Sequence, residues 1–137
     1  MGSHKAVIHI GLIYIGRITG NADMHLKNFS LYAPKGKWEL TPAYDLLNVS
    51  MVNPKDTEEL ALTLNAKKRR IKKSDFVRAM ETSGIAPKVI DNILAKYRKL
   101  LPKFNAIIDM SFLDEEDKEL YKLSIASRLA RIDESND

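Results

Sequence analysis

Three oxygen-bearing side chains, those of Asp23, Asn28 and Asp45, stand at spacings that suggest one shared site. Asn28 follows Asp23 by five positions, and Asp45 follows Asn28 by 17. Transfer of a phosphoryl group needs a carboxylate near the attacking hydroxyl and oxygen ligands for the magnesium ion that bridges the nucleotide phosphates. Side chains of these types could supply both. The spacing therefore points to phosphoryl-transfer chemistry, provided that the fold brings the three groups together.

A predicted hairpin over residues 29–40 would position them. Residues 29–32 alternate in the manner of a strand, residues 34–37 contain the proline and glycine of a turn, and residues 38–40 return. Asn28 precedes this hairpin and Asp45 follows it. Because the two arms of a hairpin begin and end at the same place, we expect Asp23, Asn28 and Asp45 at one end of it.

The rest of the chain is predicted to be mostly helical. The isoleucine-rich segment from Val7 to Ile18 has the length of a helix, whereas the alternation over residues 59–64 predicts a further strand. Beyond this point the helix signals are local. They are an N-cap at Ser74, a stop at Gly84, a start at Pro87, a break at Pro102 and an acidic first turn at Asp114 to Asp117. The fold class expected is α+β, mostly α-helical, with a small hairpin.

The same spacing occurs in protein kinases, where a loop Asp is followed five positions later by Asn and, beyond a hairpin, by a further Asp. The residues that flank Asp23, Asn28 and Asp45 indicate which group of kinases the chain resembles. The chain resembles the HipA-like serine/threonine protein kinases, toxins of toxin–antitoxin pairs, whose C-terminal lobe contains Asp-x-His-x-Lys-Asn-Phe-Ser and then Pro-x-Tyr-Asp. The matching residues are Asp23, His25, Lys27, Asn28, Phe29, Ser30, Pro42, Tyr44 and Asp45.

The resemblance implies a kinase-like C-lobe that uses ATP and Mg2+ to phosphorylate a serine or threonine of a protein substrate. It implies that Asp23 is the catalytic base, that Asn28 and Asp45 are the magnesium ligands, and that Lys27 is a positive group near ATP and the transferred phosphoryl. His25 is expected to brace the loop. A DNA-binding antitoxin is implied as a partner. His-Arg before Asp23 and Phe-Gly after Asp45 are absent, which suits the HipA branch rather than ordinary eukaryotic kinases.

A complete kinase would need more than these residues. The sequence shows no glycine-rich nucleotide loop and no N-lobe lysine and glutamate pair. Residues 5–137 are therefore interpreted as an incomplete HipA-like C-terminal kinase subdomain, expected to be inactive alone and to bind ATP and Mg2+ weakly. Residues 1–4 resemble an expression-tag remnant. A separate N-lobe chain and self-association through the apolar N-terminal segment are expected as further interactions.

Composition excludes several other classes. The 137 residues include no cysteine, which rules out disulfides and thiolate chemistry and suits a reducing cytoplasm. The apolar run near the N-terminus is shorter than a membrane span. The net charge of +4 is concentrated in the basic run of residues 67–73. Such a run can bind phosphate backbones, although no aromatic residue is interleaved to stack on bases.

The same residues also allow interpretations other than a kinase site. Asp23 and Asn28 could serve only to cap and turn the chain, and Asp45 could be the N-cap of a loop helix. The chain could be a non-catalytic interaction domain that keeps the C-lobe fold, or a basic helical domain that binds nucleic acid through residues 67–73.

Overall fold

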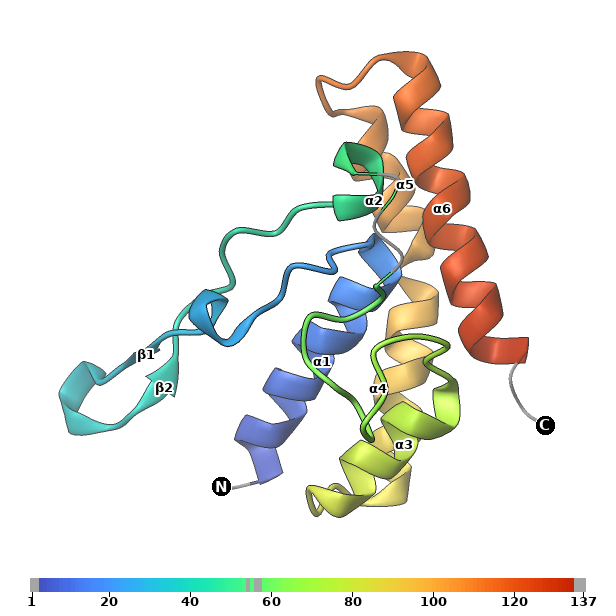
Figure 1. The fold of residues 1–137 in the computed structure, drawn as a ribbon. Coiled ribbons are helices and arrows are strands. Elements are labelled where there is room, and N and C mark those ends of the chain that lie inside the picture. Colours follow the sequence, from blue (N-terminus) through green and yellow to red (C-terminus); the bar gives the residue numbers. More distant parts are fainter. Residues whose placement is uncertain (1–2, 54, 56–57, 135–137) are drawn as a thin grey trace.

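The computed structural model describes residues 3–53, 55 and 58–134, so Met1 and Gly2 of the expected tag remnant lie outside the described residues. A helical body carries a thin two-stranded hairpin that projects from one side (Figure 1). The two strands are antiparallel, with Leu31 opposite Leu40 and Tyr32 opposite Glu39. In chain order the elements are α1 (Ser3–Thr19), η1 (Leu26–Asn28), β1 (Leu31–Tyr32), η2 (Pro34–Gly36), β2 (Glu39–Leu40), α2 (Val49–Val52), α3 (Lys73–Thr82), α4 (Pro87–Lys99), α5 (Leu101–Asp109) and α6 (Glu115–Glu134).

Helix α1 lies on the side of the helical body that faces the hairpin and contacts both α3 and α6 (Figure 1). Its buried positions Ile10, Tyr14 and Ile18 recur every four residues, so one stripe of the helix faces the core. The Tyr14 ring packs edge-on against Phe76 of α3, with 4.9 Å between centroids. The helix predicted from Val7 to Ile18 is confirmed, and Ile8 on its other side stays 43% exposed.

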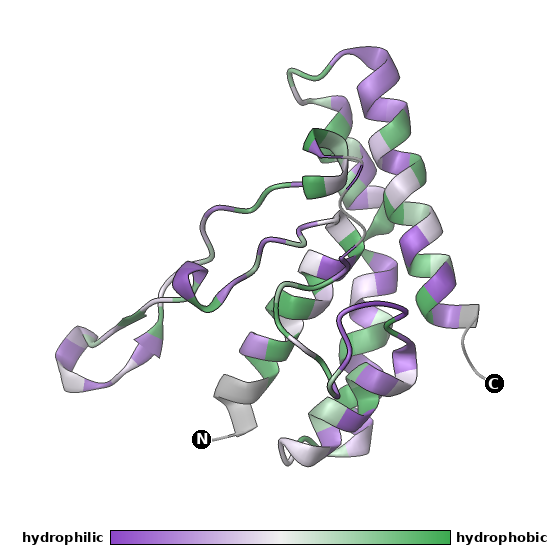
Figure 2. Cartoon of the chain, in the orientation of Figure 1, coloured by the Kyte–Doolittle hydropathy of each residue, from purple (hydrophilic) through white to green (hydrophobic). Residues whose placement is uncertain are grey.

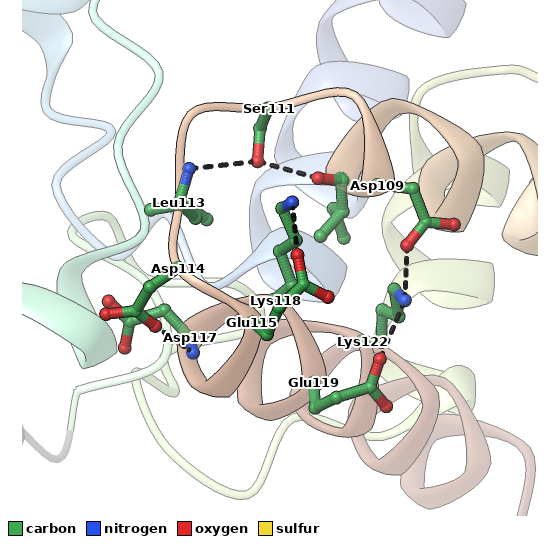
Figure 3. A network of polar contacts seen from close by, with 10 residues as sticks. Asp109, Ser111, Leu113, Asp114, Glu115, Asp117, Lys118, Glu119 and Lys122 are labelled. Carbon is green, nitrogen blue, oxygen red and sulfur yellow. Dashed lines mark hydrogen bonds and ion pairs between the residues drawn. The ribbon is translucent and has the colours of Figure 1, made fainter.

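The C-terminal helices begin and end where local signals place them. Helix α4 begins at Pro87, and the chain breaks at Leu100, so that Pro102 lies in the first turn of α5. Before α6, the Asp114 carboxylate accepts the Asp117 N–H at 2.8 Å (Figure 3). On the same side of the molecule, Lys122 of α6 bridges Asp109 of α5 and Glu119. None of the helices described is both long and apolar enough to cross a lipid bilayer.

The strand predicted over residues 59–64 is wrong. Leu60, Ala61 and Leu64 are all buried, which is not the alternate burial of a strand, and the segment forms only an isolated bridge between Leu64 and Lys67. The chain reverses directly afterwards, because Asn65 and Ala66 both have positive φ. Glu59, the first residue of the expected strand, instead pairs with Arg17 of α1 at 2.8 Å. Leu60 and Leu64 therefore pack in the hydrophobic core of the helical body and do not belong to a strand of a sheet.

The N-cap predicted at Ser74 is also wrong, since α3 begins at Lys73 with Lys72 as its N-cap. The side chain that stabilises this end is Asp75, which is only 6% exposed. Its carboxylate accepts the Lys72 N–H at 2.9 Å and the Lys67 ammonium at 2.8 Å. Burial by itself would raise the pKa of Asp75, but these hydrogen bonds outweigh it and hold the pKa below its usual value.

We expect Asp75→Ala to lower the free energy of unfolding by about 1–2 kcal/mol, the usual cost of losing such a cap. Because the pKa of Asp75 is lower in the folded chain than in the unfolded one, its contribution is complete above about pH 4 and is lost as the pH falls through the folded value. Urea unfolding of the wild type and Asp75→Ala between pH 2 and pH 7 tests this, with Glu81→Ala, an exposed position of the same helix, as control. A difference that did not shrink at low pH would contradict it.

Apolar residues are not confined to the space between the helices (Figure 2). On the hairpin, Leu31 is 61% exposed and Trp38 is 60% exposed. A cavity of about 450 Å3 lies between this hairpin and Ile8 of α1, lined also by Tyr32 and Leu40. The hairpin therefore presents apolar surface that the described part of the chain leaves uncovered.

Candidate functional site

The segment that contains the predicted site starts at a sharp turn after α1. Gly20 has φ +81°, and the Asn21 N–H bonds back to the Gly16 carbonyl at 2.8 Å. The Gly20 carbonyl in turn accepts the Val49 N–H at 2.9 Å. The backbone thus leaves the helical body at Gly20 and returns to the same residue at Val49. Residues 21–48, which include the hairpin, thus form a single excursion of the chain that leaves and rejoins the helical body at Gly20 (Figure 1).

Within the excursion, Asn28 is held by the backbone of Asp23. Its Nδ2 donates to the Asp23 carbonyl at 2.7 Å, across the short η1 turn. Since this bond occupies one side of the amide, the oxygen Oδ1 is left on the other side. The Asp23 carboxylate lies 3.2 Å from the Nε2 of His25, with both side chains nearly half exposed. The loop is further held to α1 by the His9 ring, which packs against Phe29 at a centroid distance of 4.8 Å.

Tyr44 joins the two arms of the excursion. Its hydroxyl lies 2.6 Å from the Ser30 Oγ and donates to the Lys27 carbonyl at 3.2 Å. Next to it, Asp45 has φ +53°, a left-handed conformation that Asp tolerates better than most residues. Asn28 and Asp45 consequently line one small cavity, of about 10 Å3, together with Ser30, Thr41 and Tyr44.

The predicted hairpin is confirmed, and Asn28 before it and Asp45 after it line the same cavity. Asp23 is tied to Asn28 through its backbone but does not line the cavity, and Lys27 is exposed. His25, expected to brace the loop, is 48% exposed and has Asp23 of the same loop as its partner. The part of the chain that the structure describes holds no group of three His, Cys, Asp or Glu side chains arranged as a metal site.

Asn21 is a residue that the sequence did not single out. It is 2% exposed and lines the same cavity as Asn28 and Asp45. Neither its Nδ2 nor its Oδ1 has a hydrogen-bond partner among the described residues. Because a buried unpaired amide is costly, it requires an explanation such as a bound water or ligand group. Its position directly before the Ala22–Asp23 pair was the available signal, but burial could not be inferred from it.

Comparison with known proteins places the chain in a family. The sequence model of the HipA-like C-terminal domain matches residues 10–104. A protein of Sinorhizobium fredii, named "Putative kinase Y4dM", is 29% identical over 92 residues, which is 66% of this chain and 22% of that protein. A chain from the Shewanella oneidensis MR-1 complex of HipA, HipB and operator DNA has the same fold, with a TM-score of 0.70 and 24% identity, over 91% of this chain.

The match to the solved structure covers 30% of that chain, so the present sequence spans about a fifth to a third of the relatives it resembles. The matched residues 10–104 nonetheless contain the whole excursion, from the Gly20 turn to the return at Val49. The predicted resemblance is confirmed, and the mostly helical architecture with a small two-stranded sheet is similar to that of the matched chain in the HipA complex. The chain belongs to the HipA-like C-terminal domain family.

Proposed function

We propose that this chain supplies the catalytic loop and the magnesium ligands of an ATP-dependent serine/threonine protein kinase. The observation that carries the proposal is the shared cavity of Asn28 and Asp45, which lie 17 positions apart in the sequence and are brought together by the Tyr44 hydrogen bonds. The family membership and the name of the S. fredii relative support the same activity.

The donor set suits magnesium. Mg2+ prefers hard oxygen ligands and is commonly held by one or two carboxylates together with substrate phosphates. Asp45 would provide a carboxylate and Asn28 its amide oxygen, whose orientation is fixed by the bond from Nδ2 to the Asp23 carbonyl. When bound, the ion would neutralise charge on the nucleotide phosphates. Asp45 is exposed, so a nucleotide can reach it from solvent.

Asp23 would be the base that accepts the proton of the substrate hydroxyl. Its carboxylate is 45% exposed and is therefore reachable by a serine or threonine of another protein. Lys27, exposed on the same turn, would place a positive charge near ATP and the transferred phosphoryl. Positioning and charge stabilisation of this kind supply most of the rate in phosphoryl transfer.

An N-lobe that covers ATP would complete the site. The exposed apolar surface of the hairpin, with Leu31 and Trp38, is suited to pack against such a lobe or against a second copy of the chain. The solved relative is a complex with HipB and operator DNA, which supports a DNA-binding antitoxin as a further partner.

The nucleic-acid alternative has less support. Within the basic run, Lys67 pairs with Asp75 and Lys68 pairs with Glu58, and Ile71 is buried in the core. These contacts give the run a structural role. An electrostatic surface for phosphate backbones would instead need its cations free of such pairing.

The experiment is phosphate transfer from radiolabelled ATP by the kinase completed with an N-lobe, measured with magnesium and with EDTA. We expect transfer that requires magnesium and that Asp45→Asn abolishes. Asn is a more specific replacement than Ala, because Asn tolerates the positive φ of position 45 and removes only the negative charge of the side chain. Magnesium-dependent transfer that Asp45→Asn leaves intact would overturn the assignment.

Asn21 provides a second test, because stability and activity should respond to it in opposite directions. Replacing it with Leu, a side chain of similar size, removes two unpaired buried polar atoms and should stabilise the fold by about 1 kcal/mol. If the amide binds a group of the nucleotide in the completed kinase, the same variant loses phosphate transfer. Thermal unfolding and transfer are measured on the same samples. A variant that is destabilised, or that is stabilised with full activity, would contradict this role.

A further inference from the structure

A second cavity, lined by none of the residues of the proposed phosphoryl transfer, lies between the end of α1, α2 and α6. Its volume is about 150 Å3, and its lining includes Arg17, Ser50, Glu59, Arg128 and Arg131. A single water needs roughly 10–15 Å3, so the cavity has room for a polyatomic ion. Polar and charged side chains, rather than apolar ones, form most of its wall.

Arg17 is the most buried charged group of this wall, at 3% exposure. Its Nη2 donates to the Glu59 Oε1 at 2.8 Å, while its Nε has no partner among the described residues. Glu59 uses its second oxygen to accept the Ile71 N–H at 2.9 Å, so both of its oxygens are engaged. A buried guanidinium with an unused donor is therefore part of the cavity wall.

Arg128 approaches the cavity from α6. It donates to the Ser50 Oγ at 2.8 Å and to the Arg17 carbonyl at 3.5 Å. Gly20 leaves room for this guanidinium, since a Cβ there would lie 2.8 Å from the Arg128 Nη1. Arg131, one turn further along α6, is exposed and lies at the rim. Three guanidinium groups, one from α1 and two from α6, thus line one cavity.

The charges in the wall do not balance. Of the two carboxylates, Glu59 pairs with Arg17, and Glu58 pairs with Lys68 at 3.2 Å. Burial lowers the pKa of Arg17, the paired Glu59 carboxylate opposes this change, and the charge of Arg131 adds to the lowering. Burial likewise lowers the pKa of Arg128, as do the charges of Arg17 and Arg131. Because arginine stays protonated in proteins, this repulsion persists in the folded chain and a bound anion would relieve it.

We propose that this cavity binds a phosphate group, held by Arg17, Arg128 and Arg131. A tetrahedral dianion accepts hydrogen bonds from several directions at once, and the planar guanidinium is the side chain best matched to phosphate oxygens. A single carboxylate would leave more of the surrounding positive charge unbalanced. The group can come from inorganic phosphate or from a phosphorylated serine, since both present the same oxygens.

The test is calorimetric titration of inorganic phosphate into the 137-residue chain at constant ionic strength, with chloride and acetate as reference anions. We expect saturable binding of phosphate that Arg131→Ala weakens about tenfold, the effect of losing one charge-assisted contact. Arg131 is exposed, so this variant should fold. Arg78→Ala, which removes an exposed arginine of α3, is the matched control and should change the affinity less than twofold.

Arg128→Lys is a second variant that keeps the charge but loses the fork of donors, and it should also weaken phosphate binding. Titration of O-phosphoserine distinguishes the two sources. Tighter binding than that of inorganic phosphate assigns the site to a phosphorylated side chain, and weaker binding assigns it to the free ion. Phosphate stabilises proteins generally by exclusion from their surface. Equal responses of the wild type, Arg131→Ala and Arg128→Lys, or no saturable binding by the wild type, would overturn the proposal.

Discussion

Replacing Asp23 with Asn in the kinase completed with an N-lobe should lower kcat by about 10²–10⁴-fold, the range that general base catalysis contributes. Asn keeps the size of the side chain and removes its ability to accept a proton. The loop itself should survive, because the bond that holds Asn28 uses the Asp23 backbone carbonyl and not its carboxylate. The affinity for magnesium and ATP should stay unchanged, since Asp23 does not line the cavity of Asn28 and Asp45.

Single-turnover transfer of labelled phosphate and calorimetry with magnesium and ATP measure the two quantities separately. Asp91→Asn, an exposed position of α4, is the matched control. His25→Ala removes the imidazole that lies 3.2 Å from the Asp23 carboxylate, and it tests whether that contact contributes to the rate of phosphate transfer. If Asp23→Asn retained transfer within twofold of the wild type, Asp23 would have no part in proton removal. If it lost nucleotide binding instead, its role would be that of a magnesium ligand.

The 137-residue chain alone should transfer no measurable phosphate, which is a larger loss of activity than that expected for Asp23→Asn. Fixing both reactants in near-attack geometry contributes about 7–11 kcal/mol, or roughly 10⁵–10⁸ in rate, and both must be held to gain it. The cavity between Asn28 and Asp45 is about 10 Å3 and holds no nucleotide by itself. Magnesium dehydrates reluctantly and relies on the phosphates of a bound nucleotide, so weak nucleotide binding implies weak metal binding as well.

Titration of magnesium and ATP into the isolated chain checks this, with Asp45→Asn as control and with an N-lobe added in a second series. We expect no detectable heat from the chain alone and binding once the N-lobe is present. Micromolar binding by the chain alone, abolished in Asp45→Asn, would show that these residues already form a complete nucleotide site. Failure of an added N-lobe to restore both binding and transfer would favour the non-catalytic interaction domain.

The sequence alone determined the features that depend on neighbouring residues. Pro87, Gly84 and Asp114 mark ends of helices because a fixed φ, a tolerated positive φ and a short acceptor act within one turn of the chain. The hairpin over residues 29–40 and the placement of Asn28 and Asp45 beside one cavity could be predicted for the same reason, since a tight turn brings its own flanks together. The family resemblance rested on this one contiguous stretch.

Only the tertiary structure decided the features that depend on distant residues. The segment at residues 59–64 alternates like a strand in the sequence. In the structure, Glu59 instead forms an ion pair with Arg17, 42 positions away, and Leu60 and Leu64 pack in the hydrophobic core. Arg128 reaches the Arg17 carbonyl across 111 positions, a contact with no local signal. Whether Asn21 is buried without partners likewise depends on what packs around it. Long-range packing sets burial and charge balance, and it therefore decides which polar residues become sites.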